Sequence, residues 1–171
     1  SAGHHFARII PEPQPDKKGD VELWLNTSLP WDPEDPTTTA TSAQVVVLFT
    51  GQGYAAFSLR MPWLHLHVLV AHAPHSWDIE GKAPAKAQAK AFWREVRAHL
   101  GARQGQHIPL VAMMDANVEL GLQHTLPGKI DSYPPSPSPT EYAETFISFI
   151  RHQGLALPAT FERCQKGRRT T

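Results

Sequence analysis

Residues 63–77 read "WLHLHVLVAHAPHSW", and this stretch decides the predicted fold. Residues 63–71 alternate with the period of two that is typical of a β-strand. One predicted face carries only aliphatic side chains: Leu64, Leu66, Val68 and Val70. The other face carries Trp63, His65, His67, Leu69 and Ala71. His72, Pro74 and His75 then end the apolar run, so we expect polar groups directly after a buried strand.

Five further segments have the pattern of strands. Residues 5–10 and 21–26 are short, and 21–26 alternates apolar and polar residues. Residues 44–50 and 54–60 are apolar runs joined by "GQG" (51–53), which indicates an antiparallel hairpin. Residues 108–117, "IPLVAMMDAN", predict a short apolar strand whose end carries a carboxylate and an amide.

Two segments predict helices. Residues 83–100 carry an apolar stripe, and Gly101 follows as a predicted C-cap. The stripe consists of Ala89, Phe92, Trp93, Val96 and Leu100. The second helix is expected to start at Ser138 and Pro139, with Glu141 completing a capping box, and to end at Gly154. Its buried stripe consists of Tyr142, Phe146, Phe149 and Ile150.

The order of these elements predicts an α/β or α+β fold with helices outside a sheet. A length of 171 residues with 41% hydrophobic residues favours one domain over residues 1–171. Residues 32–43 and 131–139 are rich in proline and polar residues and are expected to be surface loops. Residues 155–161 are expected to start another strand. No internal repeat is found.

Composition narrows the function classes only a little. Sixteen basic and sixteen acidic residues leave no net charge that would draw the whole chain to nucleic acid or to an anionic membrane. A single cysteine, Cys164, excludes an intrachain disulfide framework. The sequence contains no apolar run of transmembrane length and no signal-peptide pattern, so we expect an intracellular, soluble protein. It starts at Ser1 and stops after basic residues, so we expect a piece of a longer chain.

Candidate site residues lie at two predicted strand ends. Asp115 and Asn117 follow one strand, and in an extended segment both side chains would point to the same side. Together they could share an oxygen-rich ligand such as Mg²⁺ or a phosphate. His72 and His75 follow the other strand and could donate hydrogen bonds to that ligand. The structural alternative is that the Asp and Asn only cap turns.

Other aromatic and histidine residues have two interpretations as well. His65 and His67 have a spacing that could chelate a transition metal from one strand face, or they are ordinary sheet residues. With His72 they would give a zinc hydrolase as a third function. Trp24, Trp63 and Trp93 are expected to be core or sheet-edge residues rather than stacking platforms.

The order of several motifs resembles the endonuclease/exonuclease/phosphatase superfamily. The motifs are the strand that ends in "AHAPHS" (71–76), a helix with "FWREV" (92–96), "PLVAMMDANVELG" (109–121), a proline-rich loop, a helix, and "LALPATFERCQKGRRTT" (155–171). Residues 20–171 are most similar to the apurinic-endonuclease-like domains of non-LTR retrotransposons. The resemblance implies a four-layer α/β/β/α sandwich, here incomplete, and a DNA-nicking phosphodiesterase that uses Mg²⁺ or Mn²⁺.

The resemblance also implies roles for individual residues. Asp115 corresponds to the aspartate of the family's "GDFN" motif, which activates water close to the metal, and Asn117 to the asparagine that binds the scissile phosphate. His72 stands where the family has a phosphate-contacting Tyr or His, and His75 where a polar residue lines the same cleft. Arg168 and Arg169 would neutralise neighbouring phosphates. DNA is the expected partner, with a nuclear location and a reverse-transcriptase segment in the parent chain.

The sequence also departs from the family pattern. Met114 replaces the glycine of "GDFN", and Ala116 replaces its aromatic residue. The family's metal-binding glutamate and its closing Asp-His pair are expected outside residues 1–171. We therefore expect little or no nuclease activity from this chain alone. The alternative function is a catalytically incomplete remnant or interaction module with the same fold.

Overall fold

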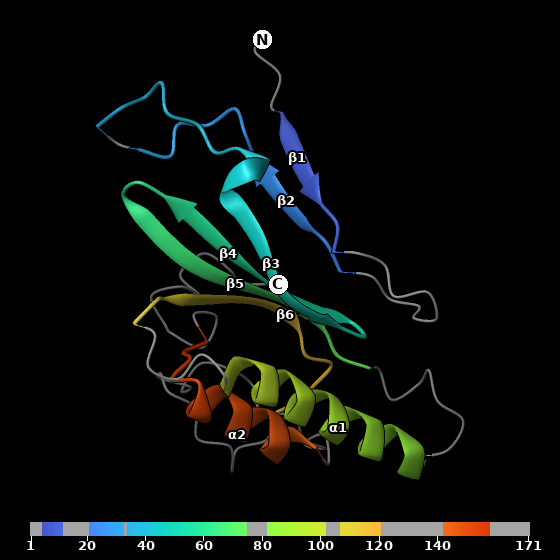
Figure 1. Ribbon diagram of the computed structural model, residues 1–171. Helices are drawn as coiled ribbons and strands as arrows, with labels where there is room; N and C mark the ends of the chain where they lie inside the picture. The colour runs from blue at the N-terminus through green and yellow to red at the C-terminus, as the bar shows by residue number, and fades with distance from the viewer. Residues whose placement is uncertain are drawn as a thin grey trace, which may run out of the picture. The chain divides into compact units, whose positions relative to one another are not determined.

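Four strands form a mixed sheet in the order β3-β4-β5-β6, and two shorter strands pair as a separate antiparallel sheet (Figure 1). The computed structural model describes residues 5–11, 21–32, 34–74, 82–101, 107–120 and 142–157. The strands are β1 (Phe6–Ile9), β2 (Leu23–Asn26), β3 (Val45–Gly51), β4 (Tyr54–Met61), β5 (Leu64–His72) and β6 (Leu110–Asp115). The helices are α1 (Lys82–Gly101), α2 (Ala143–His152) and the 3-10 turn η1 (Ser42–Gln44).

The chain divides into two compact units. Residues 1–73 and 103–115 form the first unit, which holds all the described strands, and residues 74–102 and 116–171 form the second, which holds α1 and α2. Each unit is described by itself. The mixture of helices and strands confirms the expected α/β or α+β class. The specific sandwich type and the single-domain expectation stay predictions.

The β3–β4 hairpin forms where "GQG" predicted it. Gly51 pairs with Tyr54 across the turn, and Gly53 has a φ of 77°, a left-handed conformation that glycine adopts without strain. A Cβ on Gly51 would lie 2.2 Å from the Tyr54 ring, so this position also needs glycine for space. A bulge between Val47 and Phe49 interrupts the pairing of β3 with β4.

The alternation of β5 is confirmed by its packing. Leu66 and Val68 pair with Leu59 and Phe57 of β4, so these side chains lie on one face of the sheet. That face packs against Leu23 of β2 in one apolar cluster with Ala55, Phe57 and Val68. Fully burying a side chain such as Phe57 stabilises the fold by about 1.5–3 kcal/mol, so the cluster fixes how the small sheet covers the large one.

A second apolar cluster involves the segment between β2 and β3. Ala40 of this predicted surface loop is fully buried and packs with Leu25, Leu59 and Met61. The loop is held by Asp35, whose carboxylate accepts hydrogen bonds from the hydroxyls of Thr37 (2.6 Å) and Thr38 (2.5 Å). These bonds lower the pKa of Asp35 to about 2, and the bond from Thr37 has the largest effect.

In the second unit, α1 and α2 pack through aromatic residues. The Trp93 ring lies 4.9 Å from that of Phe146 and 5.0 Å from that of Phe149, measured between centroids. Trp93, Phe146 and Phe149 are all buried, which confirms the two apolar stripes predicted from the sequence. None of the described helices is long and apolar enough to cross a membrane.

The helix ends differ in part from the prediction. The first helical residue of α2 is Ala143, with Tyr142 as an N-cap that makes no side-chain capping bond. Ser138, Pro139 and Glu141, the predicted start, lie outside the described residues. At the other end Gly154 (φ 63°) terminates the helix as expected, because its N–H bonds the Arg151 carbonyl and that of Leu155 bonds the Ile150 carbonyl.

Two other segment ends differ from the prediction. Gly101 is the last residue of α1 rather than a cap beyond it. Residues 155–157 are not in a strand, and the rest of the predicted strand 155–161 lies outside the described residues, as does the predicted loop 131–139.

Candidate functional site

The two strand ends singled out in the sequence meet at one edge of the large sheet. Strands β5 and β6 run parallel, and their last residues, His72 and Asp115, are paired in register. The backbone N–H of Ala73 donates to the Asp115 carbonyl at 2.8 Å, which extends the pairing by one bond. Neighbouring strands lie about 5 Å apart, so the backbone holds an imidazole next to a carboxylate.

Both side chains lie on the same face of the sheet. Residues paired across two strands share a face, and His72 follows Val68 and Val70 at intervals of two along β5. His72 and Asp115 are both exposed, and on β6 the same face carries Val111 and Met113, which are 46% and 47% exposed. The His72–Asp115 pair therefore lies at the end of an open apolar strip.

This pair offers complementary polar groups to a ligand. The imidazole of His72 can donate a hydrogen bond to an anionic oxygen, and the carboxylate of Asp115 can bind a cation or accept a proton from water. Among the residues that the structure describes, no group of three or more His, Cys, Asp or Glu side chains is arranged to hold a metal ion. The role of Asp115 as a metal ligand therefore stays a prediction.

Asn117 does not continue the strand. Strand β6 ends at Asp115, and Asn117 adopts a left-handed backbone conformation with a φ of 48°. The expectation that both side chains point to one side depended on an extended backbone, so it was wrong at this position. Asn tolerates this conformation better than most residues, and the Asn117 carbonyl accepts a hydrogen bond from the Tyr142 hydroxyl at 2.8 Å. Asn117 belongs to the second unit and Asp115 to the first.

The remaining predicted substrate-binding residues lie outside the described part of the chain. These are His75, Arg168 and Arg169. Their roles stay predictions.

The alternation of β5 contradicts the zinc-hydrolase interpretation. His65 and His67 share one face, and their rings contact each other with centroids 5.3 Å apart. His72 lies on the opposite face, because it is separated from them by odd numbers of residues along the same strand. The three histidines therefore cannot bind one zinc ion.

His65 has partners that the sequence pattern did not indicate. Arg60 Nε donates to His65 Nε2 at 3.3 Å, and Ser58 Oγ lies 3.0 Å from the same nitrogen. A guanidinium only donates, so Nε2 is an acceptor and the Ser58 hydroxyl donates to it as well. Ser58 is only 3% exposed, which makes this Ser–His pair a structural contact rather than a nucleophile for an outside substrate.

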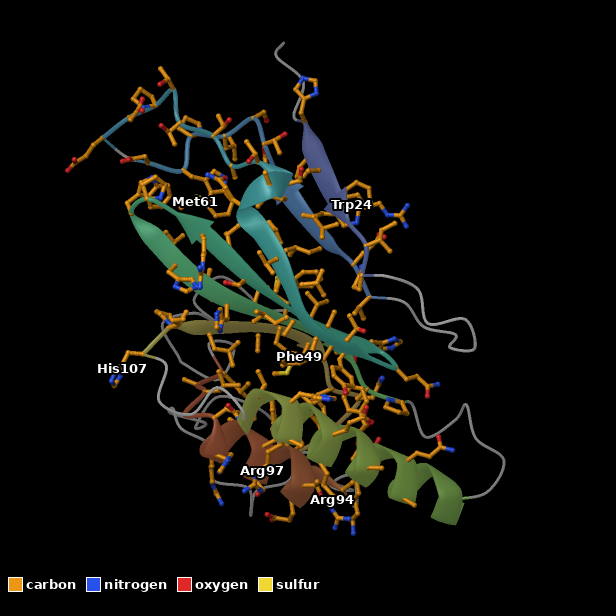
Figure 2. The ribbon with its side chains drawn as sticks, in the orientation of Figure 1. Trp24, Phe49, Met61, Arg94, Arg97 and His107 are labelled. Atoms are coloured by element: carbon orange, nitrogen blue, oxygen red, sulfur yellow. The ribbon has the colours of Figure 1, made fainter. Side chains whose placement is uncertain are left out.

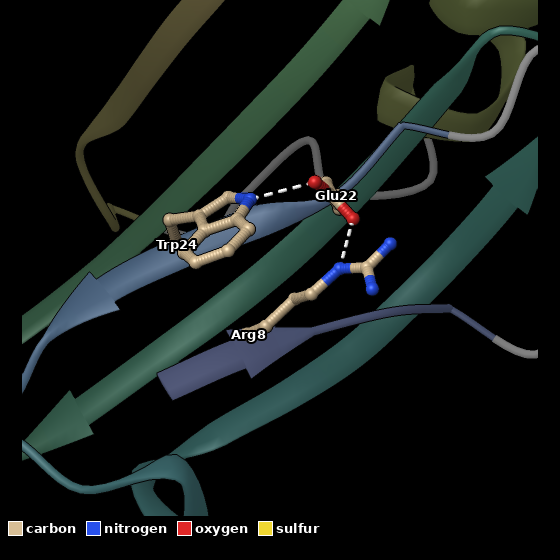
Figure 3. Close-up of polar contacts among 3 residues, drawn as sticks. All are labelled: Arg8, Glu22 and Trp24. Carbon is tan, nitrogen blue, oxygen red and sulfur yellow. Dashed lines mark hydrogen bonds and ion pairs between the residues drawn. The ribbon is translucent and has the colours of Figure 1, made fainter. Parts of the chain in front are cut away.

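A third polar cluster lies on the outer face of the small sheet (Figure 3). Glu22 accepts hydrogen bonds from Trp24 Nε1 (2.7 Å) and from Arg8 Nε, and these bonds lower the pKa of Glu22, that from Trp24 having the larger effect. The Arg8 guanidinium lies 5.9 Å from the centroid of the Trp24 ring. Trp24 lies on strand β2, as expected of a sheet residue, but it is 57% exposed.

Sequence reasoning missed this cluster because Arg8 and Trp24 are far apart in the chain. They face each other only through the register of β1 with β2, which no local pattern indicates. The sequence does indicate that Glu22 and Trp24 share one face, because they are two residues apart in an extended segment.

Comparison of the chain with family models, with curated proteins and with solved structures found no match.

Proposed function

We propose that this chain is part of a metal-dependent phosphodiester hydrolase domain that nicks DNA, built on a two-sheet α/β/β/α sandwich. The observation that supports the proposal is the pairing of His72 with Asp115 at the carboxyl ends of two parallel strands. The sequence motifs "AHAPHS" and "MMDAN" require these two strand ends to be neighbours if the resemblance is correct. A sheet with the two residues on opposite faces or at opposite ends would have excluded the proposal.

The chemistry of the pair agrees with phosphodiester hydrolysis. In-line attack on a phosphodiester requires a positioned water, a cation and hydrogen-bond donors for the non-bridging oxygens. In the proposed arrangement His72 donates to a non-bridging oxygen, and Asp115 orients the attacking water or holds the cation. Both side chains are exposed, so a phosphate group can reach them without a rearrangement of the sheet.

Asp115 could supply one ligand of a magnesium or manganese site. Mg²⁺ in phosphoryl-transfer sites is commonly held by one or two carboxylates together with substrate phosphates and water. Asp115 supplies one such carboxylate. The cation would lower the barrier by stabilising the charge that develops on the phosphate oxygens.

Mn²⁺ binding followed by NMR tests the proposed site directly. A paramagnetic Mn²⁺ ion bound to Asp115 should broaden the amide signals of His72, Ala73 and Asp115 first. The Asp115→Asn variant should lose this selective broadening. Asp35→Asn is the matched control, because it removes another carboxylate of the same unit and should leave the broadening unchanged. Broadening centred on another part of the chain, or uniform broadening, would contradict the proposal.

Cleavage of supercoiled plasmid DNA is the second measurement. With Mg²⁺ present we expect little or no nicking by residues 1–171, because Met114 and Ala116 replace the glycine and the aromatic residue of the family motif. Nicking that disappears in Asp115→Ala would overturn the expected inactivity and support the hydrolase assignment.

One observation favours the alternative of a non-catalytic remnant or interaction module. The backbone of Asn117 already has a structural role, since its left-handed turn accepts the Tyr142 hydroxyl bond. A remnant would show no selective Mn²⁺ broadening at Asp115, so the NMR measurement distinguishes the two functions, whereas little or no nicking is expected for both.

A further inference from the structure

A groove runs along the line where α1 packs against α2, within the second unit. It consists of two adjoining hollows of about 280 Å³ and 340 Å³ that share Arg97, Glu144 and Ser148. Its charged lining residues are Arg94, Arg97, Glu144, Arg151 and His152, and we call this feature the α1–α2 groove. Arg94 and Arg97 both lie on the α2 side of α1 (Figure 2).

The base of the groove is packed. Trp93 and Phe149 line it from below, and both side chains are 1% exposed. Arg97 Nη2 also donates to His152 Nδ1 at 3.3 Å, which links the two helices at the rim. The helix pair therefore fixes the backbone positions from which the cationic side chains extend.

Positive charge dominates the groove although the whole chain has no net charge. Three guanidinium groups face one carboxylate, that of Glu144. Arg151 lies in the last turn of α2, where the helix dipole favours a cation. Arg94 and Arg97 lie further from the end of their helix, and both side chains are exposed.

The basic residues continue along α1 beyond the groove. Lys90, Arg94 and Arg97 follow each other at spacings of four and three residues. At 3.6 residues per turn these positions fall within an arc of about 60° and extend over about 10 Å of helix. Glu95 is about 100° away from the nearest of these positions. We call this row of positions the basic stripe.

We propose that the basic stripe and the α1–α2 groove bind the phosphate backbone of a nucleic acid. A regular row of cations matches a polymer with a regular row of phosphates, and duplex DNA carries one negative charge per about 1.7 Å of its axis. Arginine donors are also suited to phosphate oxygens, because the guanidinium group can bond them in pairs. The proposal does not depend on the hydrolase function, since binding needs neither Asp115 nor a metal.

An anionic membrane is the competing partner for a basic helix. Helices that bind membranes insert their apolar face into the lipid. The apolar face of α1, which contains Phe92, Trp93 and Val96, is buried in this protein. The structure therefore favours a nucleic acid, and vesicles become an outcome of the test.

Fluorescence anisotropy of a labelled DNA duplex in EDTA tests the inference. We expect the full chain to bind with an affinity that falls linearly with salt on logarithmic axes. The double variant Arg94→Ala/Arg97→Ala should bind roughly tenfold more weakly, and its salt slope should decrease by about 2, one for each arginine. Glu144→Gln should change the affinity in the opposite direction, by roughly twofold to fivefold, because it removes the repulsive carboxylate.

The control separates this site from a general loss of surface charge. Arg60→Ala removes an exposed arginine of the first unit and should leave the affinity and the salt slope within error. Circular dichroism establishes that each variant is folded. Absence of DNA binding at low salt, an unchanged salt slope in the double variant, or binding to phosphatidylserine vesicles in preference to DNA would overturn the inference.

Discussion

The end of the β5–β6 pair and the α1–α2 groove hold their polar groups in opposite ways. His72 and Asp115 are positioned by the backbone, through the register of two parallel strands, and their side chains are exposed. Arg94 and Arg97 are positioned by side-chain packing, because the helix that carries them is fixed through the buried ring of Trp93. One feature depends on a hydrogen-bond ladder and the other on an aromatic contact.

This difference predicts how each region responds to substitution. The backbone ladder persists when an exposed side chain is changed, so residues at the strand end can vary at little cost in stability. The groove depends on a few buried rings, and a change beneath it moves the cations that lie above.

The largest expected effect is that of Trp93→Ala, which tests whether the helix pair depends on this buried ring. Removing a large buried ring from the contact with Phe146 and Phe149 should lower the free energy of unfolding by about 3–5 kcal/mol. Trp63→Ala is the control, since Trp63 is 39% exposed and its loss should cost well under half as much. Urea denaturation measures both values. A cost below about 1 kcal/mol for Trp93→Ala would show that the helix pair does not depend on this ring.

Two glycine substitutions test the backbone conformation at the ends of the two helices. Gly154→Ala should destabilise the protein by about 1 kcal/mol, because alanine is strained at a φ of 63°. Gly101→Ala should stabilise it by about 0.5–1 kcal/mol, because Gly101 is helical and has open space around its Cα. Thermal denaturation should therefore show shifts of opposite sign. Shifts of the same sign would mean that the end of α2 is not fixed by its left-handed residue.

The smallest expected effect concerns pH and the loop of the sheet unit. Asp35 has a pKa of about 2, lowered from 3.8 first by the Thr37 hydroxyl bond. A lowered carboxyl pKa stabilises the fold fully above the unfolded value of 3.8, and this contribution is lost as the pH falls through about 2. Thr37→Val should raise the pKa of Asp35 towards 3.8 in an NMR titration. Thr27→Val, which removes a hydroxyl bonded to the His5 carbonyl, should not move it.

The parts of the fold that local periodicity encodes were predictable from the sequence. The two faces of β5 and the stripe of α1 follow from repeats of two and of three to four residues, and burial of Val68 and Trp93 confirms them. The glycine signals at residues 51–53 and at Gly154 were equally readable, because few other residues adopt these conformations.

Features that depend on register or on strand ends were not predictable. The sequence indicated that Asp115 and Asn117 follow a strand, but it did not show that the extended backbone stops at Asp115. The sequence motifs placed the strand ends of His72 and Asp115 around one ligand, but the exact pairing of these two residues, like that of Arg8 with Trp24, is decided by strand register, which residue patterns leave open. The basic stripe was hidden by a net charge of zero, which averages over both units.

The parallel pairing of β5 with β6 has a consequence for how the protein folds. β4 and β5 are joined by a tight turn, whereas residues 73–109 separate the end of β5 from the start of β6. Each doubling of a loop costs about 0.6 kcal/mol of additional closure entropy, so we expect the antiparallel hairpins to form before the parallel pair. On this expectation His72 and Asp115 meet late in folding.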